Sequence, residues 1–197
     1  MTKMIQILAL AACGLTACAP APYFDLRARV TPAFIASVTT PMVLIELPQK
    51  PYAATIVPVA ANGPVTTWAT PDAITLSMIN GVVTATRGMG TDLMHSDIDG
   101  TVAALAGGPR AYDRRFSYQN AENQTVLRAQ RCTMSGPADQ ALTLYGTTYV
   151  AQMWTETCTG NDQQMPNIYW TAGGRVVQSQ QFISAAVGPI ITETIRN

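Results

Sequence analysis

The chain has 197 residues and carries 12 lysine and arginine residues against 12 aspartate and glutamate residues, so its formal net charge is zero. Without a basic stripe, this balance argues against binding to nucleic acid or to anionic lipid, which clustered positive charge favours. The length is sufficient for one domain with a hydrophobic core.

The first residues have the pattern of a secretory signal. Lys3 precedes a short apolar run at 7–12, and small residues follow up to Cys18. This order is typical of a signal peptide, and the run is shorter than the about 20 apolar residues that span a bilayer. The residues Leu-Thr-Ala-Cys ending at Cys18 resemble a bacterial lipobox, in which the cysteine is lipidated and the chain is cut before it. The sequence therefore predicts a signal peptide at 1–17 and a lipid anchor on Cys18, with a plain secretory signal as the alternative.

The residues after the anchor predict where the protein resides. Ala19 follows Cys18, and a small residue here, rather than an acidic one, favours the outer membrane by analogy with lipoprotein sorting. Several acyl chains, such as palmitate, anchor a protein more firmly than one. Pro20 and Pro22 stiffen the tether that follows. We expect a tether at 18–30, a folded domain at 31–197, and a protein that faces the periplasm.

The elements expected from residue 31 onward are mostly strands. Thr31 and Pro32 predict a short helix to about residue 38, because threonine caps a helix and proline suits its first turn. A second short helix is expected at 99–105, with Asp97 or Asp99 as its cap. Apolar and β-branched runs predict strands at 41–47, 52–60, 65–70, 74–79, 82–86, 112–119, 124–134, 142–145, 148–159, 167–171, 175–184 and 187–195.

Three hairpin turns are expected between these strands. Asn80-Gly81 between alternating runs predicts a type I′ hairpin, which needs a positive φ at both positions. Further hairpins are expected at 120–123 and at Gly173-Gly174. Many short strands at close spacing predict an all-β protein, a single antiparallel β-sandwich or barrel-like domain with one or two short helices.

Two cysteines remain besides Cys18 once the signal peptide is removed. Cys132 and Cys158 predict one disulfide, because the periplasm is oxidising. A zinc site is the alternative, but two cysteines with His95 as the only histidine make a poor set of zinc ligands.

The segment 84–100 concentrates residues that other proteins use for chemistry. Gly88 and Gly90 suggest a phosphate loop, but Leu93 stands where the dinucleotide pattern needs glycine, and the Gly-Lys-Ser/Thr of a P-loop is absent. We therefore expect these glycines to permit backbone angles that are closed to other residues.

Acidic side chains and a histidine follow those glycines. Asp92, Asp97 and Asp99 lack the regular spacing and terminal glutamate of an EF-hand, so we expect capping and turn roles for them. His95 is the only imidazole available to a general base or a triad, with Ser96 or Asp97 nearby. A lone histidine is more often a surface or packing residue, so we expect no catalytic residue, metal or cofactor.

Aromatic residues offer a possible glycan contact. Trp154, Tyr169 and Trp170 lie in predicted strands, where such rings either fill the core or pair across strands. Their alternative role is a stacking platform for sugars.

Several segments together resemble the YjbF/GfcB family of group 4 capsule lipoproteins. One of them has the pattern T-x-G-hydrophobic-G-x-D-L, which includes Gly88, Gly90, Asp92 and Leu93. The segments that carry the likeness are Thr67-Trp68, 80–93, Glu156-Thr157-Cys158, Asn167-Ile168-Tyr169-Trp170 and Gln178-Ser179-Gln180-Gln181-Phe182-Ile183-Ser184. The likeness extends from about residue 41 to the C-terminus, and the predicted lipobox agrees with it.

The resemblance implies an all-β outer-membrane lipoprotein encoded among genes for exopolysaccharide or capsule production and export. It supplies no catalytic residues, so the loop glycines and Asp92 are positions of the family pattern without assigned chemistry. We expect a non-catalytic accessory or scaffold that binds other export proteins. The alternatives are a periplasmic module that binds the polysaccharide directly and, less favoured, a polysaccharide-modifying enzyme.

Overall fold

The computed structural model of the protein describes residues 25–119, 122, 124–160 and 166–197. The predicted signal peptide, Cys18 and most of the predicted tether lie outside the described residues, as does part of the hairpin expected at 120–123. Within the described residues, no helix is both long and apolar enough to cross a membrane.

The described residues form twelve strands, two α-helices and one turn of 3₁₀ helix. The helical elements are η1 (Arg27–Arg29), α1 (Pro32–Ser37) and α2 (Asp99–Leu105). The strands are β1 (Met42–Leu47), β2 (Tyr52–Asn62), β3 (Val65–Ala69), β4 (Thr75–Ile79), β5 (Val82–Arg87), β6 (Leu93–Ser96), β7 (Ala111–Gln119), β8 (Thr125–Leu144), β9 (Thr147–Thr159), β10 (Asn167–Ala172), β11 (Arg175–Ser184) and β12 (Gly188–Arg196). The predicted all-β class with two short helices is confirmed.

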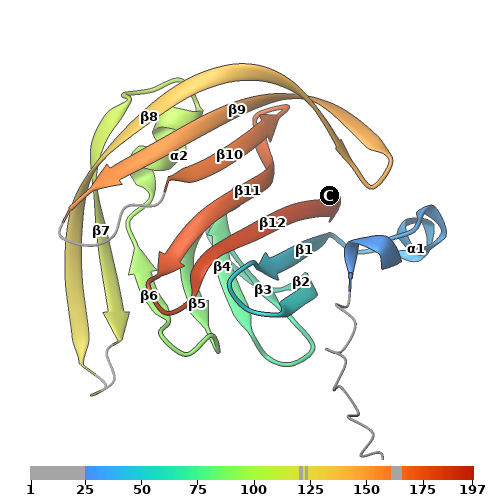
Figure 1. The fold of residues 1–197 in the computed structure, drawn as a ribbon, viewed down its shortest axis with the longest axis horizontal. Helices are drawn as coiled ribbons and strands as arrows, with labels where there is room; N and C mark the ends of the chain where they lie inside the picture. Colours follow the sequence, from blue (N-terminus) through green and yellow to red (C-terminus); the bar gives the residue numbers. More distant parts are fainter. Residues whose placement is uncertain (1–24, 120–121, 123, 161–165) are drawn as a thin grey trace, which may run out of the picture.

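All the strands belong to one antiparallel sheet, in the order β5-β4-β3-β2-β1-β12-β11-β10-β9-β8-β7-β6 (Figure 1). The sheet curls until its two outermost strands meet. Thr84 Oγ1 on β5 donates to the carbonyl oxygen of Ser96 on β6 at 2.9 Å, and the backbone N–H of Leu93 donates to Thr86 Oγ1 at 3.0 Å. Side-chain bonds therefore join the seam, and the domain is a nearly closed barrel-like sheet rather than a sandwich.

Two clusters of buried side chains fill the space inside the sheet. One includes Ile45, Leu76 and Ile190. The other includes Met134 and Tyr169, together with Ile98 and Ala104 from α2 and its N-cap. Inward-facing side chains pack a small barrel, so α2 completes the core next to β7–β10.

The N-terminal segment packs on the outer face of the sheet. Val30 forms a small cluster with Leu44 on β1 and Ile195 on β12. Arg27 forms ion pairs with Glu46 and Glu193, at 3.0 Å for the latter. The last residues of the predicted tether are thus held against the two strands at the middle of the sheet order (Figure 1).

The sequence prediction succeeds best at turns and helix caps where the residue types themselves favour one local conformation. Asn80 and Gly81 have φ of 48° and 82°, which confirms the type I′ hairpin. The α1 helix is confirmed, and Thr31 caps it by accepting from the N–H of Phe34 at 3.2 Å. The α2 helix is also confirmed, but its predicted cap is wrong, because Ile98 occupies the N-cap without a side-chain bond.

Two strand predictions are wrong. We expected separate strands at 124–134 and 142–145, but β8 continues between them, and its register shifts between Ser135 and Ala138. A bulge accommodates Pro137, which cannot donate to the sheet. The prediction also missed β6, whose four residues pair with β7.

Candidate functional site

Glu156 is the centre of a buried polar cluster inside the sheet. Its side chain is fully buried, and five donors at 2.6–3.1 Å reach its two carboxylate oxygens. The donors come from α2, β7 and β10 and are Thr101, Tyr112, Arg114, Asn167 and Tyr169. One side chain on β9 therefore ties four elements together.

Arg114 is the charge partner of Glu156. Its Nη1 lies 2.7 Å from Glu156 Oε2, and its Nη2 donates to Ser96 Oγ on β6 at 2.7 Å. Burial alone would raise the pKa of Glu156, but the charge of Arg114 and the hydrogen bonds from Thr101, Asn167 and Tyr112 lower it below the ordinary carboxyl value. Burial would likewise lower the pKa of Arg114, but the Glu156 carboxylate raises it. The pair is ionised and closed to solvent.

The remaining donor of Arg114 has no hydrogen-bond partner among the described residues. Its Nε is buried without one, while the guanidinium lies 4.8 Å from the centroid of the Phe116 ring. A cation over an aromatic face is attracted by the ring quadrupole, which offsets part of the cost of the unpaired donor.

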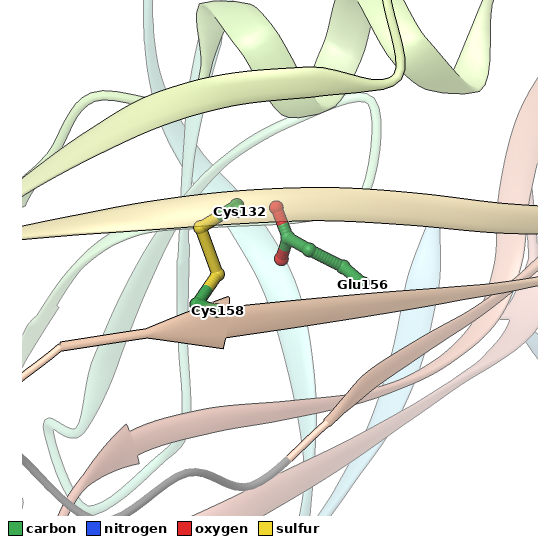
Figure 2. Close-up of side chains that lie close together, drawn as sticks. All are labelled: Cys132, Glu156 and Cys158. Atoms are coloured by element: carbon green, nitrogen blue, oxygen red, sulfur yellow. A yellow bond between two sulfur atoms is a disulfide. The ribbon is translucent and has the colours of Figure 1, made fainter.

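The predicted disulfide lies next to this cluster. Cys132 on β8 and Cys158 on β9 are direct cross-strand partners and are bonded to each other, so that prediction is confirmed. Figure 2 shows the Glu156 carboxylate beside the two sulfurs, and the three groups lie within 4.8 Å of one another. Because the sulfurs are bonded to each other and the carboxylate is fully hydrogen-bonded, this group does not present the thiolates that zinc requires.

The family-pattern loop, residues 86–93, is held together by hydrogen bonds that involve the side chains of Asp92 and Thr86. Asp92 accepts from the backbone N–H groups of Gly88 at 2.9 Å and Met89 at 3.1 Å, and from Thr86 Oγ1 at 3.0 Å. Gly88 has φ of 88°, and a Cβ there would lie 3.3 Å from the carbonyl oxygen of Ala73. The loop from β5 to β6 is thus a shaped turn whose aspartate is committed to internal hydrogen bonds.

The candidate catalytic residues of this segment are not brought together. His95 is exposed on β6, whereas Ser96 is buried on the opposite face and accepts from Arg114. Asp97 accepts from the N–H of Asp99 at 3.3 Å, which matches the expected turn role. The geometry of a Ser-His-Asp triad is not formed here.

The three aromatic residues considered for glycan contact do not form one platform. Trp154 is 4% exposed and Tyr169 is 0% exposed, and both point inward, where they donate hydrogen bonds to Thr171 and Glu156. Trp170 is half-buried on the other face of β10, where its indole N–H donates to Gln140 at 2.9 Å. Adjacent residues on a strand face opposite sides, so Tyr169 and Trp170 cannot stack on one sugar chain.

Several residues of the segments that resemble the family have structural roles in the folded domain. Asn167, Tyr169 and Glu156 all belong to the buried cluster. Gln181, buried on β11, donates to the carbonyl oxygen of Gly81 at 2.8 Å and accepts from the N–H of Val83 at 2.9 Å. It thereby links β11 to the seam strand β5.

A pocket of about 410 Å³ lies at one end of the barrel-like sheet. The ends of β2, β4 and β12 and the starts of β1, β3 and β11 meet there. Its lining includes Trp68, Asn80, Arg175, Thr194 and Arg196. Sequence reasoning did not find this pocket, because its residues come from strand ends that are distant in the chain.

Comparisons with known proteins agree with this fold. The crystal structure of the hypothetical lipoprotein YmcC from Escherichia coli (K12) superimposes with a TM-score of 0.73 at 20% sequence identity, covering 84% of this chain and 88% of that one. That likeness shows the fold. A search of curated protein sequences found no match.

A family model matches nearly the whole folded part. It is described as group 4 capsule polysaccharide lipoprotein gfcB, YjbF, and it matches residues 20–195. The match includes the disulfide, the Glu156 cluster and the loop at 86–93, which confirms the resemblance seen in the sequence. The chain therefore belongs to the YjbF family of group 4 capsule polysaccharide lipoproteins.

Proposed function

We propose that the protein is a lipid-anchored accessory of exopolysaccharide or capsule production and export, and that it acts without catalysing a reaction. The observation that carries this proposal is the family match over residues 20–195. Membership makes the chain a lipoprotein related to capsule polysaccharide. The accessory role, the outer membrane as its site and the periplasmic orientation are our additions.

The anchor is proposed at Cys18. The lipobox ends at that residue, and only six residues separate it from Asp25, where the described structure begins. A chain spans at most about 3.3–3.6 Å per residue, so Asp25 stays within roughly 25 Å of the anchor. Metabolic labelling with an alkyne-tagged palmitate tests this proposal, because Cys18→Ala is expected to abolish the label and retained label would contradict it.

The partners are proposed to be other proteins of the export system. Arg27 of η1 pairs with Glu46 on β1 and with Glu193 on β12, which supports a defined presentation of the domain to its neighbours. Crosslinking in intact envelopes, followed by identification of the captured proteins, tests this role. Capture of export components supports it, whereas capture of none of them, with the protein itself abundant, contradicts it.

Direct contact with the polysaccharide is the second candidate. The observation that favours it is the pocket at the end of the barrel-like sheet, whose lining combines an indole with two guanidinium groups. Enzymatic modification of the polymer is the third and least favoured candidate. If His95→Ala abolishes polymer production while the variant protein accumulates normally, the enzymatic hypothesis gains support over the accessory one.

A further inference from the structure

The pocket at the end of the sheet has a positive rim. Arg175 lies at the start of β11 and Arg196 at the end of β12, and both line the pocket. Among the described residues that line the pocket there is no aspartate or glutamate. The rim is therefore suited to an anionic ligand.

Both arginines of the rim are exposed. Among the described residues Arg175 makes no ion pair, and it is exposed. Among the described residues, the Arg196 side chain makes one hydrogen bond, to the carbonyl oxygen of Ile35 at 3.4 Å. Guanidinium groups match both carboxylates and phosphates in a planar, two-point geometry, and a carboxylate is the anion that an acidic sugar of a polysaccharide offers.

The floor of the pocket is apolar and partly aromatic. Val43 and Met78 are buried there, and Trp68 is partly buried against the same core cluster. An apolar and aromatic lining with a few placed polar groups, in a volume between about 300 and 1,000 Å³, is characteristic of sites for small ligands. Sugar rings present both an apolar C–H face and polar hydroxyls, and the lining of the pocket also includes the polar side chains of Thr66, Asn80 and Thr194.

The shape of the pocket is fixed by close contacts between two hairpins. Asn80 Nδ2 donates to the carbonyl oxygen of Gly174 at 3.0 Å. Gly81 approaches β11 so closely that an added Cβ would lie 2.7 Å from the Cβ of Val176. Gln181 bonds the same turn from inside the sheet. Because these hairpin turns are held in place before binding, they lose little conformational freedom when the ligand enters.

We propose that this pocket binds a segment of acidic polysaccharide, with Arg175 and Arg196 on the carboxylate of a uronic acid and Trp68 against the apolar face of a sugar ring. The proposal rests on the proposed function, since the polymer is the ligand that a capsule-related lipoprotein meets. It places the contact at the barrel rim and not at Trp154, Tyr169 or Trp170.

The test uses the full-length protein purified in a non-ionic detergent. Trimers of galacturonate, glucuronate and mannuronate are titrated by calorimetry, with the methyl esters of the same trimers as neutral controls. We expect saturable binding of at least one acid trimer, at least about tenfold weaker binding of its ester, and weaker binding at high salt, because bonds to a charged group are the stronger ones. Equal binding of acid and ester, or no saturable binding of any trimer, overturns the proposal.

Matched variants locate the contact. Arg175→Ala is expected to weaken binding of the acid trimer about tenfold or more. Arg115→Ala removes the same charge from an exposed site on β7, outside the pocket lining, and is expected to leave affinity unchanged. Circular dichroism confirms the fold of both. Equal effects of the two variants overturn the proposal, as does Arg175-dependent binding to phosphatidylglycerol vesicles without binding of any trimer.

The outcome is separable from that of the proposed function. If the trimers do not bind but deletion of the gene changes the surface polymer, the pocket inference fails and the accessory role stands. If Arg175-dependent binding is found but deletion leaves the polymer unchanged, the site stands and the role in production or export fails.

Discussion

Replacing Glu156 by glutamine tests the central role of the buried cluster. Glu156 is fully buried and Arg114 is 3% exposed, so the substitution leaves a buried guanidinium without its counter-charge. Removing one partner of a buried ion pair costs about 3–5 kcal/mol. In addition, the amide NH₂ of glutamine faces at least two of the five donors that reach the carboxylate. This loss is large against a typical free energy of unfolding of about 5–15 kcal/mol.

The assay is urea unfolding of the purified full-length protein with its disulfide intact, followed by tryptophan fluorescence. Asp113→Asn is the matched control, since Asp113 pairs with Arg131 at 3.1 Å on the surface of the same sheet, with side chains 67% and 60% exposed. Exposed pairs contribute about 1 kcal/mol or less. If Glu156→Gln lowers the free energy of unfolding by no more than Asp113→Asn does, the reasoning is refuted.

Three further predictions concern the same domain. The lowered pKa of Glu156 means that its stabilisation is complete above the ordinary carboxyl pKa of about 4.3 and is lost as pH falls through the lower folded value. The difference in urea midpoint between wild type and Glu156→Gln should therefore shrink below about pH 4, and a difference that stays constant down to pH 3 would contradict this. Replacing Cys132 and Cys158 together by alanine should lower the free energy of unfolding by about 2–5 kcal/mol, and an unchanged urea midpoint would argue against a stabilising disulfide. Gly81→Ala should destabilise more than Gly90→Ala in thermal melts, because both have positive φ but only the Cβ at 81 meets another side chain; equal losses would show that the contact with Val176 does not matter.

The part of the fold that sequence predicts is the part fixed by local chemistry. Asn80-Gly81 demands positive φ at two positions, and Thr31 with Pro32 starts a helix whatever packs against it. The strand that was missed, β6, has only four residues, and it owes its state to pairing with β7 rather than to its own propensity. The choice between sandwich and barrel depends on whether β5 meets β6, which is a contact between distant parts of the curled sheet.

In the candidate site, too, the sequence predicts features that depend on few residues and misses those that depend on contacts between distant segments. The disulfide was predicted because the compartment and the cysteine count left one pairing. The role of Glu156 was not predicted, although its segment was noticed, because its partners come from α2, β7 and β10. Arg114 gave no signal, since a charged residue in a strand usually faces solvent. The pocket was missed for the same reason, because Arg175 and Arg196 meet Trp68 only after the strand ends converge.

The measurement that tests the account most directly is the amount and chain length of surface polysaccharide in a deletion strain. The strain is complemented with the wild-type gene or with Cys18→Ala, and immunoblots verify that both proteins accumulate. The account predicts that deletion lowers the amount or alters the length of the polymer, that the wild-type gene restores both, and that the unanchored variant does not. An unchanged polymer after deletion, or full restoration by Cys18→Ala, would contradict a membrane-anchored accessory of polysaccharide production and export.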